Sequence, residues 1–299
     1  MRLLLLGANG QVGHALRPEL ARLGEVVCTT RSGTLPDGGD CGRADFDQPG
    51  TLAALVDRVA PDVVVNAAAY TAVDRAEQER DAAFRANADA PAALAEACAR
   101  RGALLVHYST DYVFGGNGSR PWREDDATAP LGVYGASKLA GEEAIRASGA
   151  RHMIFRTAWV YGAHGHNFMR TMLRLAAERD ELRVVDDQHG TPTAARLIAS
   201  VTAAVLASTD QPSGLWHLTA SGGTTWHGFA SAIIEGAHAR GLLSQRPRVA
   251  PVPGSEYPTP ARRPAYSRLD TSALQAQWPI ALPPWRDDLD RVLDDLAAR

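Results

Sequence analysis

The first thirteen residues constrain the fold of this chain more than any other segment. Leu3 to Leu6 form a short apolar run typical of a buried strand, and glycines follow it at intervals of three: Gly7, Gly10 and Gly13. Glycines between a strand and a helix permit a tight turn, close approach of backbone to a pyrophosphate, and close packing of helix on strand. The Gly-x-x-Gly-x-x-Gly spacing is a weak pattern alone. Its position after the first strand favours a dinucleotide site over a plain turn.

Strand-like and helix-like segments alternate through the first half of the chain. We expect strands at residues 26–30, 61–69, 103–111 and 151–159. We expect helices at residues 50–59, 82–101, where Asn87 could face inward, and 134–145. This alternation predicts an α/β fold of the Rossmann type, a doubly wound parallel sheet that binds ligands at the carboxyl ends of its strands.

The alternation weakens after about residue 165. We expect helices at 167–179, from 194 to about 208, and at 225–240, and a short strand at 215–219. The proline-rich stretch 249–268 is too irregular for a core element. We therefore predict a cofactor-binding domain over 1–165 and a smaller, mixed α/β region over 166–299 that mainly binds substrate, with the chain crossing between them.

The composition excludes several classes of protein. Hydrophobic residues make up 45% of the 299 residues and charged residues 22%, as in a soluble globular protein. The net charge of −3 favours no nucleic-acid partner. No apolar run approaches the roughly 18 residues of a membrane span, and the chain opens without a signal-peptide pattern. The three cysteines are scattered and odd in number, which indicates reduced thiols in a cytoplasmic protein.

A single lysine, Lys138, stands among 31 basic residues, and Tyr134 lies four positions before it. On a helix these two side chains share one face. An ammonium beside a phenol favours the phenolate, so we expect the pKa of Tyr134 to fall from about 10 toward the working pH, where a general acid is most effective. The alternative is a surface tyrosine with a solvated lysine. His107, on an expected buried strand, is interpreted as packing.

The end of the second expected strand indicates which dinucleotide binds. An NAD site would place Asp or Glu there to hold the ribose 2′-hydroxyl, whereas this chain has Thr30 and Arg31. A guanidinium attracts a 2′-phosphate, so NADPH is favoured, without strict exclusion of NADH. The alternative interpretation of Arg31 is an exposed arginine in a loop.

Four motifs together resemble the extended short-chain dehydrogenase/reductase family, over almost the whole chain. They are Gly10-Gln-Val-Gly13, Asn66-Ala-Ala-Ala-Tyr-Thr-Ala-Val-Asp74, His107-Tyr-Ser-Thr-Asp-Tyr-Val-Phe114 and Tyr257-Pro-Thr-Pro-Ala-Arg-Arg-Pro264. The last motif lies outside the cofactor fold and is the most informative about substrate. Within the family, the resemblance is to reductases of 4-keto sugar nucleotides. It implies NADPH-dependent reduction of dTDP-4-dehydro-L-rhamnose to dTDP-L-rhamnose.

The resemblance also implies site residues. Implied catalytic residues are Thr110, Tyr134 and Lys138. Implied cofactor-binding residues, beside the three glycines and Arg31, are Gln11, Val12, Asp45, Phe46, Ala68, Ala69, Tyr70, Tyr134 and Lys138. Implied substrate-binding residues are Thr110, Asp111, Trp159, Arg262 and Arg263, the two arginines being suited to a diphosphate.

Other activities of the same fold are alternatives. A 4,6-dehydratase typically carries Thr-Asp-Glu, but Tyr112 follows Asp111 here, and an epimerase normally retains NAD, which Thr30-Arg31 disfavours. A non-catalytic NADP-binding regulatory subunit would not need the Thr110, Tyr134 and Lys138 set. Reduction of a different dTDP-4-keto-6-deoxyhexose remains open.

Two positions bear on metal and assembly. Some reductases of this kind bind magnesium through glutamates at a dimer interface, where this chain has Ala15 and Arg196. Neither a methyl group nor a guanidinium supplies the oxygen ligands that magnesium requires. We therefore expect no metal, and either a metal-independent homodimer or a monomer.

Overall fold

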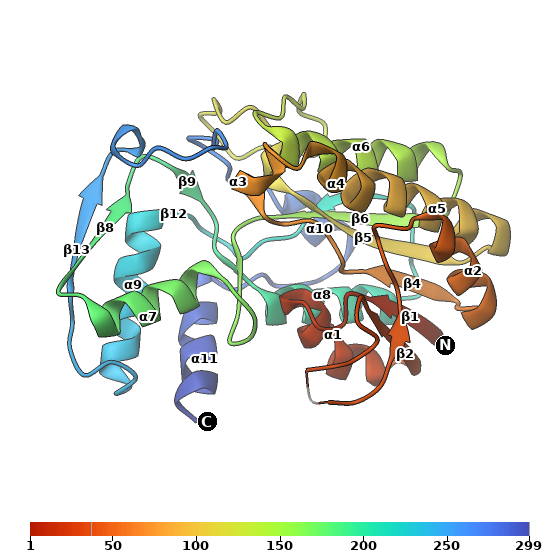
Figure 1. Ribbon diagram of the computed structural model, residues 1–299, viewed down its shortest axis with the longest axis horizontal. Coiled ribbons are helices and arrows are strands. Elements are labelled where there is room, and N and C mark those ends of the chain that lie inside the picture. Colours follow the sequence, from red (N-terminus) through yellow and green to blue (C-terminus); the bar gives the residue numbers. More distant parts are fainter. Residues whose placement is uncertain (37, 299) are drawn as a thin grey trace.

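A seven-stranded parallel sheet forms the centre of the computed structural model, which describes residues 1–36 and 38–298 (Figure 1). The strands run in the order β11-β6-β5-β4-β1-β2-β3. Their bounds are β1 Arg2–Leu6, β2 Glu25–Thr30, β3 Gly42–Arg43, β4 Val63–Asn66, β5 Leu104–Thr110, β6 His152–Thr157 and β11 Gly214–His217. The predicted doubly wound parallel sheet is confirmed.

Helices cover both faces of this sheet, and each strand contributes alternate residues to the two layers. Leu3 and Leu5 pack against α1 (Gln11–Ala21) and α8 (Ala195–Ala207). Leu4 and Leu6 pack in a separate core with α2 (Gly50–Val59) and α5 (Ala90–Arg101). Helix α6 (Val133–Ala147) lies beside α5 on that second face (Figure 1). Because the sheet is buried on both faces, its strands are apolar at almost every position.

Two expected elements differ in extent. The strand expected at 61–69 ends at Asn66, so its alanines form an extended segment at the sheet edge. The helix expected at 82–101 comprises α4 (Arg80–Phe84), a π-helical turn η1 (Arg85–Asp89) and α5. Asn87 faces inward from that turn, as expected: its side chain bonds both backbone groups of Tyr70 and the hydroxyl of Ser137. A π-turn of this kind is frequent at functional sites.

Beyond β6 the chain builds a second region, seen at the left of Figure 1. Its helices are α7 Phe168–Glu178, α9 Trp226–Ala239 and α11 Trp285–Ala297, whereas α10 Ser272–Gln277 lies beside β11 of the central sheet. Its strand pairs are β7 Val160–Tyr161 with β10 Thr193–Ala194, β9 His189–Gly190 with β12 Thr224–Thr225, and β8 Glu181–Val185 with β13 Arg248–Val252. Short helices complete the chain: α3 Val73–Ala76, η2 Asp111–Val113 and η3 Gly254–Glu256.

Four further expected elements are confirmed within a few residues: the helices at 167–179, 194–208 and 225–240 and the strand at 215–219. The stretch 249–268 was expected to be irregular throughout, but its first residues belong to strand β13, which pairs with β8. Sequence reasoning missed this strand. Helix α8 and strand β11 return to the central sheet, so the chain crosses between its two regions. A domain boundary at residue 165 stays a prediction. Across residues 1–36 and 38–298, the structure has no helix with the length and apolarity to cross a membrane.

Candidate active site

The glycine turn joins β1 to α1 at the carboxyl edge of the sheet. Gly7 has φ +75°, a left-handed conformation that favours glycine. A Cβ atom on Gly13 would lie 2.0 Å from the carbonyl oxygen of Gly7, so only glycine lets the helix pack this close. The predicted roles of Gly7 and Gly13 are confirmed. The N-terminus of α1, beginning at Gln11 without a side-chain cap, is suited to a pyrophosphate.

The other residues implied for the cofactor lie along the same edge. The hydroxyl of Thr30 accepts from the N–H of Gly33 at 2.9 Å and donates to the carbonyl of Thr34 at 3.1 Å. This fixes the turn after β2 and leaves Arg31 exposed at its start. Phe46 is buried in the core beyond β2, whereas after β4 Ala68 is half-buried and Ala69 is exposed. The groups present fit a dinucleotide with a 2′-phosphate.

Helix α6 carries Tyr134 in its first turn and Lys138 one turn later. The expected lowering of the tyrosine pKa is wrong for this structure. Burial raises the pKa of Tyr134 to about 12, the charge of Asp111 adds to the rise, and a hydrogen bond with Thr110 opposes it. The ammonium does not compensate because Lys138 is engaged elsewhere.

Lys138 points into the protein, where its side chain is buried. Its Nζ donates to the carbonyl oxygen of Tyr108 at 2.6 Å and lies 3.1 Å from Nε2 of His107. Burial lowers the pKa of Lys138 to about 8, and the carboxylate of Glu142 partly opposes this. His107 in turn bonds the amide of Asn66. His107 therefore does more than pack.

Thr110 is the last residue of β5 and Asp111 follows it, beside Tyr134. The hydroxyl of Thr110 donates to Oδ1 of Asp111 at 3.1 Å. Burial raises the pKa of Asp111 to about 7, although hydrogen bonds to its carboxylate act in the opposite direction. The ring of Tyr112 meets that of Tyr134 edge-on, with centroids 5.8 Å apart. The phenol thus lies among groups that donate and accept hydrogen bonds.

Trp159, implied as a sugar contact, has an unusual backbone for a bulky residue, with φ +47°. Its indole stacks on that of Trp226, with centroids 3.6 Å apart and planes at 5°. Trp159 is half-buried rather than part of the core. A strained, partly open aromatic residue of this kind is typical of a ligand site.

The two arginines of the loop before residue 264 lie in different surroundings. The guanidinium of Arg263 forms two hydrogen bonds with the carboxylate of Asp74, at 3.0 and 2.8 Å. Arg262 is exposed and lines a narrow crevice together with Tyr134 and Tyr112. The structure therefore brings this loop to the tyrosine, with Arg262 as the arginine more open to a diphosphate.

A buried ion pair beneath these residues escaped sequence reasoning. Glu142 of α6 and Arg156 of β6 are joined at 3.0, 3.2 and 2.7 Å, and the hydroxyl of Ser109 donates to the same carboxylate. The available signals were an arginine directly after the apolar residues 153–155 of the expected strand and a glutamate one turn after Lys138. The pair fixes β5, β6 and α6 together directly below Thr110 and Lys138.

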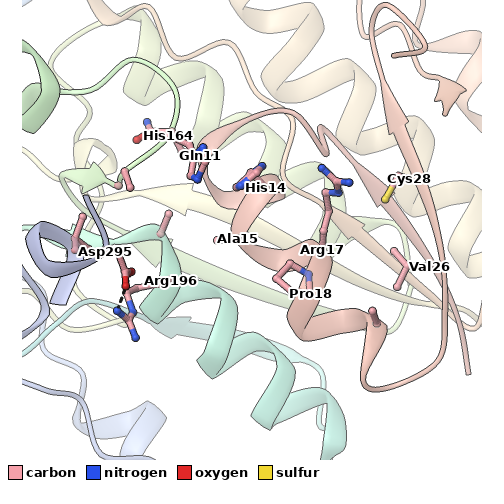
Figure 2. Close-up of a pocket in the computed structure, with 15 residues that line it drawn as sticks. Gln11, His14, Ala15, Arg17, Pro18, Val26, Cys28, His164, Arg196 and Asp295 are labelled. Atoms are coloured by element: carbon pink, nitrogen blue, oxygen red, sulfur yellow. Dashed lines mark hydrogen bonds and ion pairs between the residues drawn. The ribbon is translucent and has the colours of Figure 1, made fainter. Parts of the chain in front are cut away.

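The residues considered for magnesium lie in a pocket on the opposite face, between α1 and α8 (Figure 2). The methyl group of Ala15 offers no ligand atom to a metal, and the guanidinium of Arg196 lies 3.3 Å from the carboxylate of Asp295. This pocket does not fit magnesium, because its arginine would repel the ion. Over the whole of residues 1–36 and 38–298, no three His, Cys, Asp or Glu side chains group to hold a metal. Independence from metal stays a prediction.

The sheet order, the glycine turn and the Tyr134–Lys138 pair define an NADP-dependent oxidoreductase of the extended short-chain dehydrogenase/reductase class. The family model described as RmlD substrate binding domain matches residues 1–298. Relatives from Shigella flexneri and Escherichia coli (strain K12), both named dTDP-4-dehydrorhamnose reductase, are each 48% identical over 99% of this chain and 98% of their own. This chain belongs to the dTDP-4-dehydrorhamnose reductase family.

Comparison with solved structures supports membership of the same family. The dTDP-4-dehydrorhamnose reductase of Bacillus anthracis in complex with NADP superposes with a TM-score of 0.89 at 32% identity, covering 98% of this chain and 99% of that one. The dTDP-4-dehydrorhamnose reductase orthologue of Clostridium acetobutylicum gives a TM-score of 0.90 at 36% identity, covering 99% of both chains.

Proposed function

We propose that this protein reduces the 4-keto group of dTDP-4-dehydro-L-rhamnose with NADPH, which gives dTDP-L-rhamnose. The observation that carries this proposal is that Thr110 and the Tyr134–Lys138 helix stand at the same carboxyl edge of the parallel sheet as the glycine turn of Gly7 and Gly13. Relatives that share 48% of their residues with the chain are named for this reaction. Their names and the NADP complex of the Bacillus anthracis structure support both substrate and cofactor.

The mechanism assigns a separate task to each side chain. NADPH, when bound, supplies a hydride to the carbonyl carbon. Tyr134 donates its phenolic proton to the carbonyl oxygen as negative charge develops there, which completes the alcohol. Its high pKa keeps the phenol protonated, as an acid requires. Thr110 donates a hydrogen bond to the same oxygen and stabilises its charge.

The remaining residues hold the reactants. Gly7, Gly10, Gln11, Val12 and Gly13, at the N-terminus of α1, would hold the pyrophosphate of the cofactor. Arg31 attracts the 2′-phosphate. Asp45, Phe46, Ala68, Ala69 and Tyr70 would also hold the cofactor, and Tyr134 and Lys138 would hold its nicotinamide half.

On the substrate side, Asp111 and Trp159 contact the sugar, and Arg262 and Arg263 serve the diphosphate. In this proposal residues 1–165 mainly bind the cofactor and 166–299 mainly the sugar nucleotide. The enzyme works in the cytoplasm as a monomer or a metal-independent homodimer.

Incubation with NADPH and a panel of dTDP-4-keto-6-deoxyhexoses tests the proposal. We expect one NADPH oxidised per keto sugar and dTDP-L-rhamnose as the product identified by NMR. Turnover confined to another hexose would assign the enzyme to that sugar. Binding of NADP without turnover of any keto sugar would instead indicate a regulatory subunit. The Tyr134→Phe variant is the control for non-enzymatic reduction.

A further inference from the structure

The starting point is the indole of Trp159, whose two faces are both covered by protein. One face stacks on the indole of Trp226, with centroids 3.6 Å apart and planes at 5°. The other face meets Gly190, where a Cβ atom would lie 2.3 Å from Cε2 of Trp159 and 2.6 Å from both Cζ2 and Nε1. Cε2 is the ring-junction carbon between these two atoms, and an approach within the ring plane would meet them first. The backbone of Gly190 therefore lies over the face of the indole that Trp226 does not cover.

Both covers belong to one pair of strands. β9 and β12 run antiparallel, with Thr224 opposite Gly190, and Trp226 begins α9 directly after β12. The side chain of Thr225 accepts from the N–H of Gly228 at 3.0 Å, which caps α9 and fixes its first turn. The space between Trp226 and Gly190, called the indole slot below, therefore has two walls that are fixed relative to each other.

Trp159 leaves the central sheet at its carboxyl edge. Thr157, the last residue of β6, is paired in register with Thr110 of β5, and Trp159 follows two positions later. The backbone of Trp159 is left-handed, with φ +47°, and its carbonyl oxygen accepts from the N–H of Thr193 at 3.2 Å. A bulky residue keeps such a conformation only where its surroundings enforce it, and here the indole slot does so.

The indole slot is also bonded to the segment that follows Arg262 and Arg263. The N–H of His189, in β9, donates to the carbonyl oxygen of Ala265 at 2.8 Å, and the carbonyl oxygen of His189 accepts from the N–H of Ser267 at 2.8 Å. The slot is thus connected both to the sheet edge that carries the catalytic threonine and to the arginines proposed for the diphosphate. A hexose joins these two parts of the substrate.

The open part of Trp159 is an edge, because the residue is half-buried and both faces of its indole are covered. The edge of an aromatic ring carries the positive end of its quadrupole, whereas the face carries the negative end. An edge therefore attracts oxygen atoms.

We propose that Trp226 and Gly190 are positioning residues, which hold Trp159 with its edge toward the oxygen atoms of the hexose. The inference rests on the proposed reductase function and deepens it. In this arrangement the indole is a rigid wall of the sugar site and not a platform on which the sugar stacks.

The first test measures the stack by ¹⁹F NMR of full-length protein labelled with 5-fluorotryptophan. The chain has six tryptophans, and the variants Trp159→Phe and Trp226→Phe assign the two resonances. We expect the ring current of each indole to shift the resonance of the other. We expect this shift to remain on saturation with dTDP-L-rhamnose and NADPH, a pair that cannot react. A Trp159 resonance that is unchanged in Trp226→Leu, or a shift that collapses when the ligands bind, would overturn the inference.

Calorimetry first establishes that both ligands bind. Failure to bind them would count against the proposed function, whereas the spectrum of the free protein would still decide whether the indole is held in the slot. The two failures are therefore distinguishable.

The second test removes one wall of the slot with Trp226→Leu. We expect KM for the keto sugar to rise about tenfold and kcat to change less than about twofold, because a mobile edge binds substrate and transition state less well by the same amount. Trp226→Phe keeps a flat ring against the indole and should recover most of the loss. The dissociation constant of NADPH should be the same in both variants. A fall in kcat at unchanged KM would contradict the proposal.

Gly190→Ala alters the other wall, since its methyl group would lie 2.3 Å from the indole of Trp159. Gly214→Ala is the matched control, because its methyl group would lie 2.7 Å from the indole of Trp216, which is buried at β11. Both variants should lower the urea midpoint, but only Gly190→Ala should raise KM for the keto sugar. An equal rise in both would assign the effect to lost stability and would overturn the inference. If Gly190→Ala does not fold, the comparison of Trp226→Leu with Trp226→Phe still decides.

Discussion

Two ion pairs of the same chemistry occupy opposite settings in this protein. Glu142 and Arg156 lie beneath the active site, with side chains 1% and 4% exposed. Arg196 and Asp295 lie at the pocket on the other face, with side chains 45% and 57% exposed. The first pair has several hydrogen bonds between 2.7 and 3.2 Å, whereas the second has one at 3.3 Å.

The difference shows where this chain requires a fixed geometry. Charges removed from water need close partners: the carboxylate of the buried pair also accepts from the hydroxyl of Ser109, and the guanidinium lies 5.0 Å from the ring of Phe114. Ser109 precedes Thr110, and Glu142 lies one turn after Lys138, so the pair fixes two of the catalytic residues. Solvent screens the exposed pair, so that pair contributes little to stability.

The largest expected effect comes from breaking the buried pair. Arg156→Met leaves the buried Glu142 without its cationic partner, with only the hydroxyl of Ser109 still donating to it, and we expect the free energy of unfolding to fall by about 3–5 kcal/mol. Urea denaturation measures the loss. The double variant Arg156→Met with Glu142→Leu should recover most of it, because no charge is then left unpaired. A loss below about 1 kcal/mol for the single variant would mean that the pair is no more important than a surface pair.

Tyr134→Phe separates chemistry from stability within the same region. We expect kcat to fall at least about 100-fold, equivalent to about 2.7 kcal/mol, because the variant lacks the proton donor. NADPH binding and the urea midpoint should change little. Steady-state kinetics and cofactor titration check both statements. A near wild-type rate would assign the acid role to another group, and Asp111, with its raised pKa, would be examined next.

The sequence predicted what depends on local spacing. The glycine turn and the Tyr134–Lys138 pair lie within one turn or one helix, so residue types alone place them. The partners of Lys138 could not be predicted this way, because His107 and Tyr108 come from β5, and the contact of His107 with Asn66 of β4 depends on strand register. Two residues opposite each other on neighbouring strands, such as Asn66 and His107, are 41 positions apart in the chain.

The same reason explains the two main errors. The pKa of Tyr134 was predicted from its helical neighbour, yet burial beneath the loop around residue 262 dominates it. Strand β13 was missed because prolines interrupt its pattern; Pro251 lies inside the strand, on a two-stranded sheet where it is tolerated at an edge. Both the pKa of Tyr134 and the formation of β13 depend on contacts between segments far apart in the chain.

A smaller effect is expected at the exposed cofactor edge. Arg31→Ala should weaken NADPH binding by about 1.5–3 kcal/mol, the scale of a hydrogen bond to a charged group, and leave NADH nearly unaffected. Fluorescence titration with both cofactors measures the difference. Arg43→Ala, which removes another exposed arginine near the same loop, is the matched control. Equal losses for NADPH and NADH would remove Arg31 from the 2′-phosphate.

The smallest effect is expected at the exposed pair. Arg196→Ala should change the free energy of unfolding by less than about 1 kcal/mol, since the partner carboxylate of Asp295 regains its hydration. Chelation should have no effect either: the arginine and the methyl group of Ala15 offer magnesium no oxygen ligand. We therefore expect the rate and the gel-filtration volume to be the same with EDTA and with added magnesium. Loss of a dimer and of activity on chelation, both restored by magnesium, would show that this surface binds the ion despite Arg196.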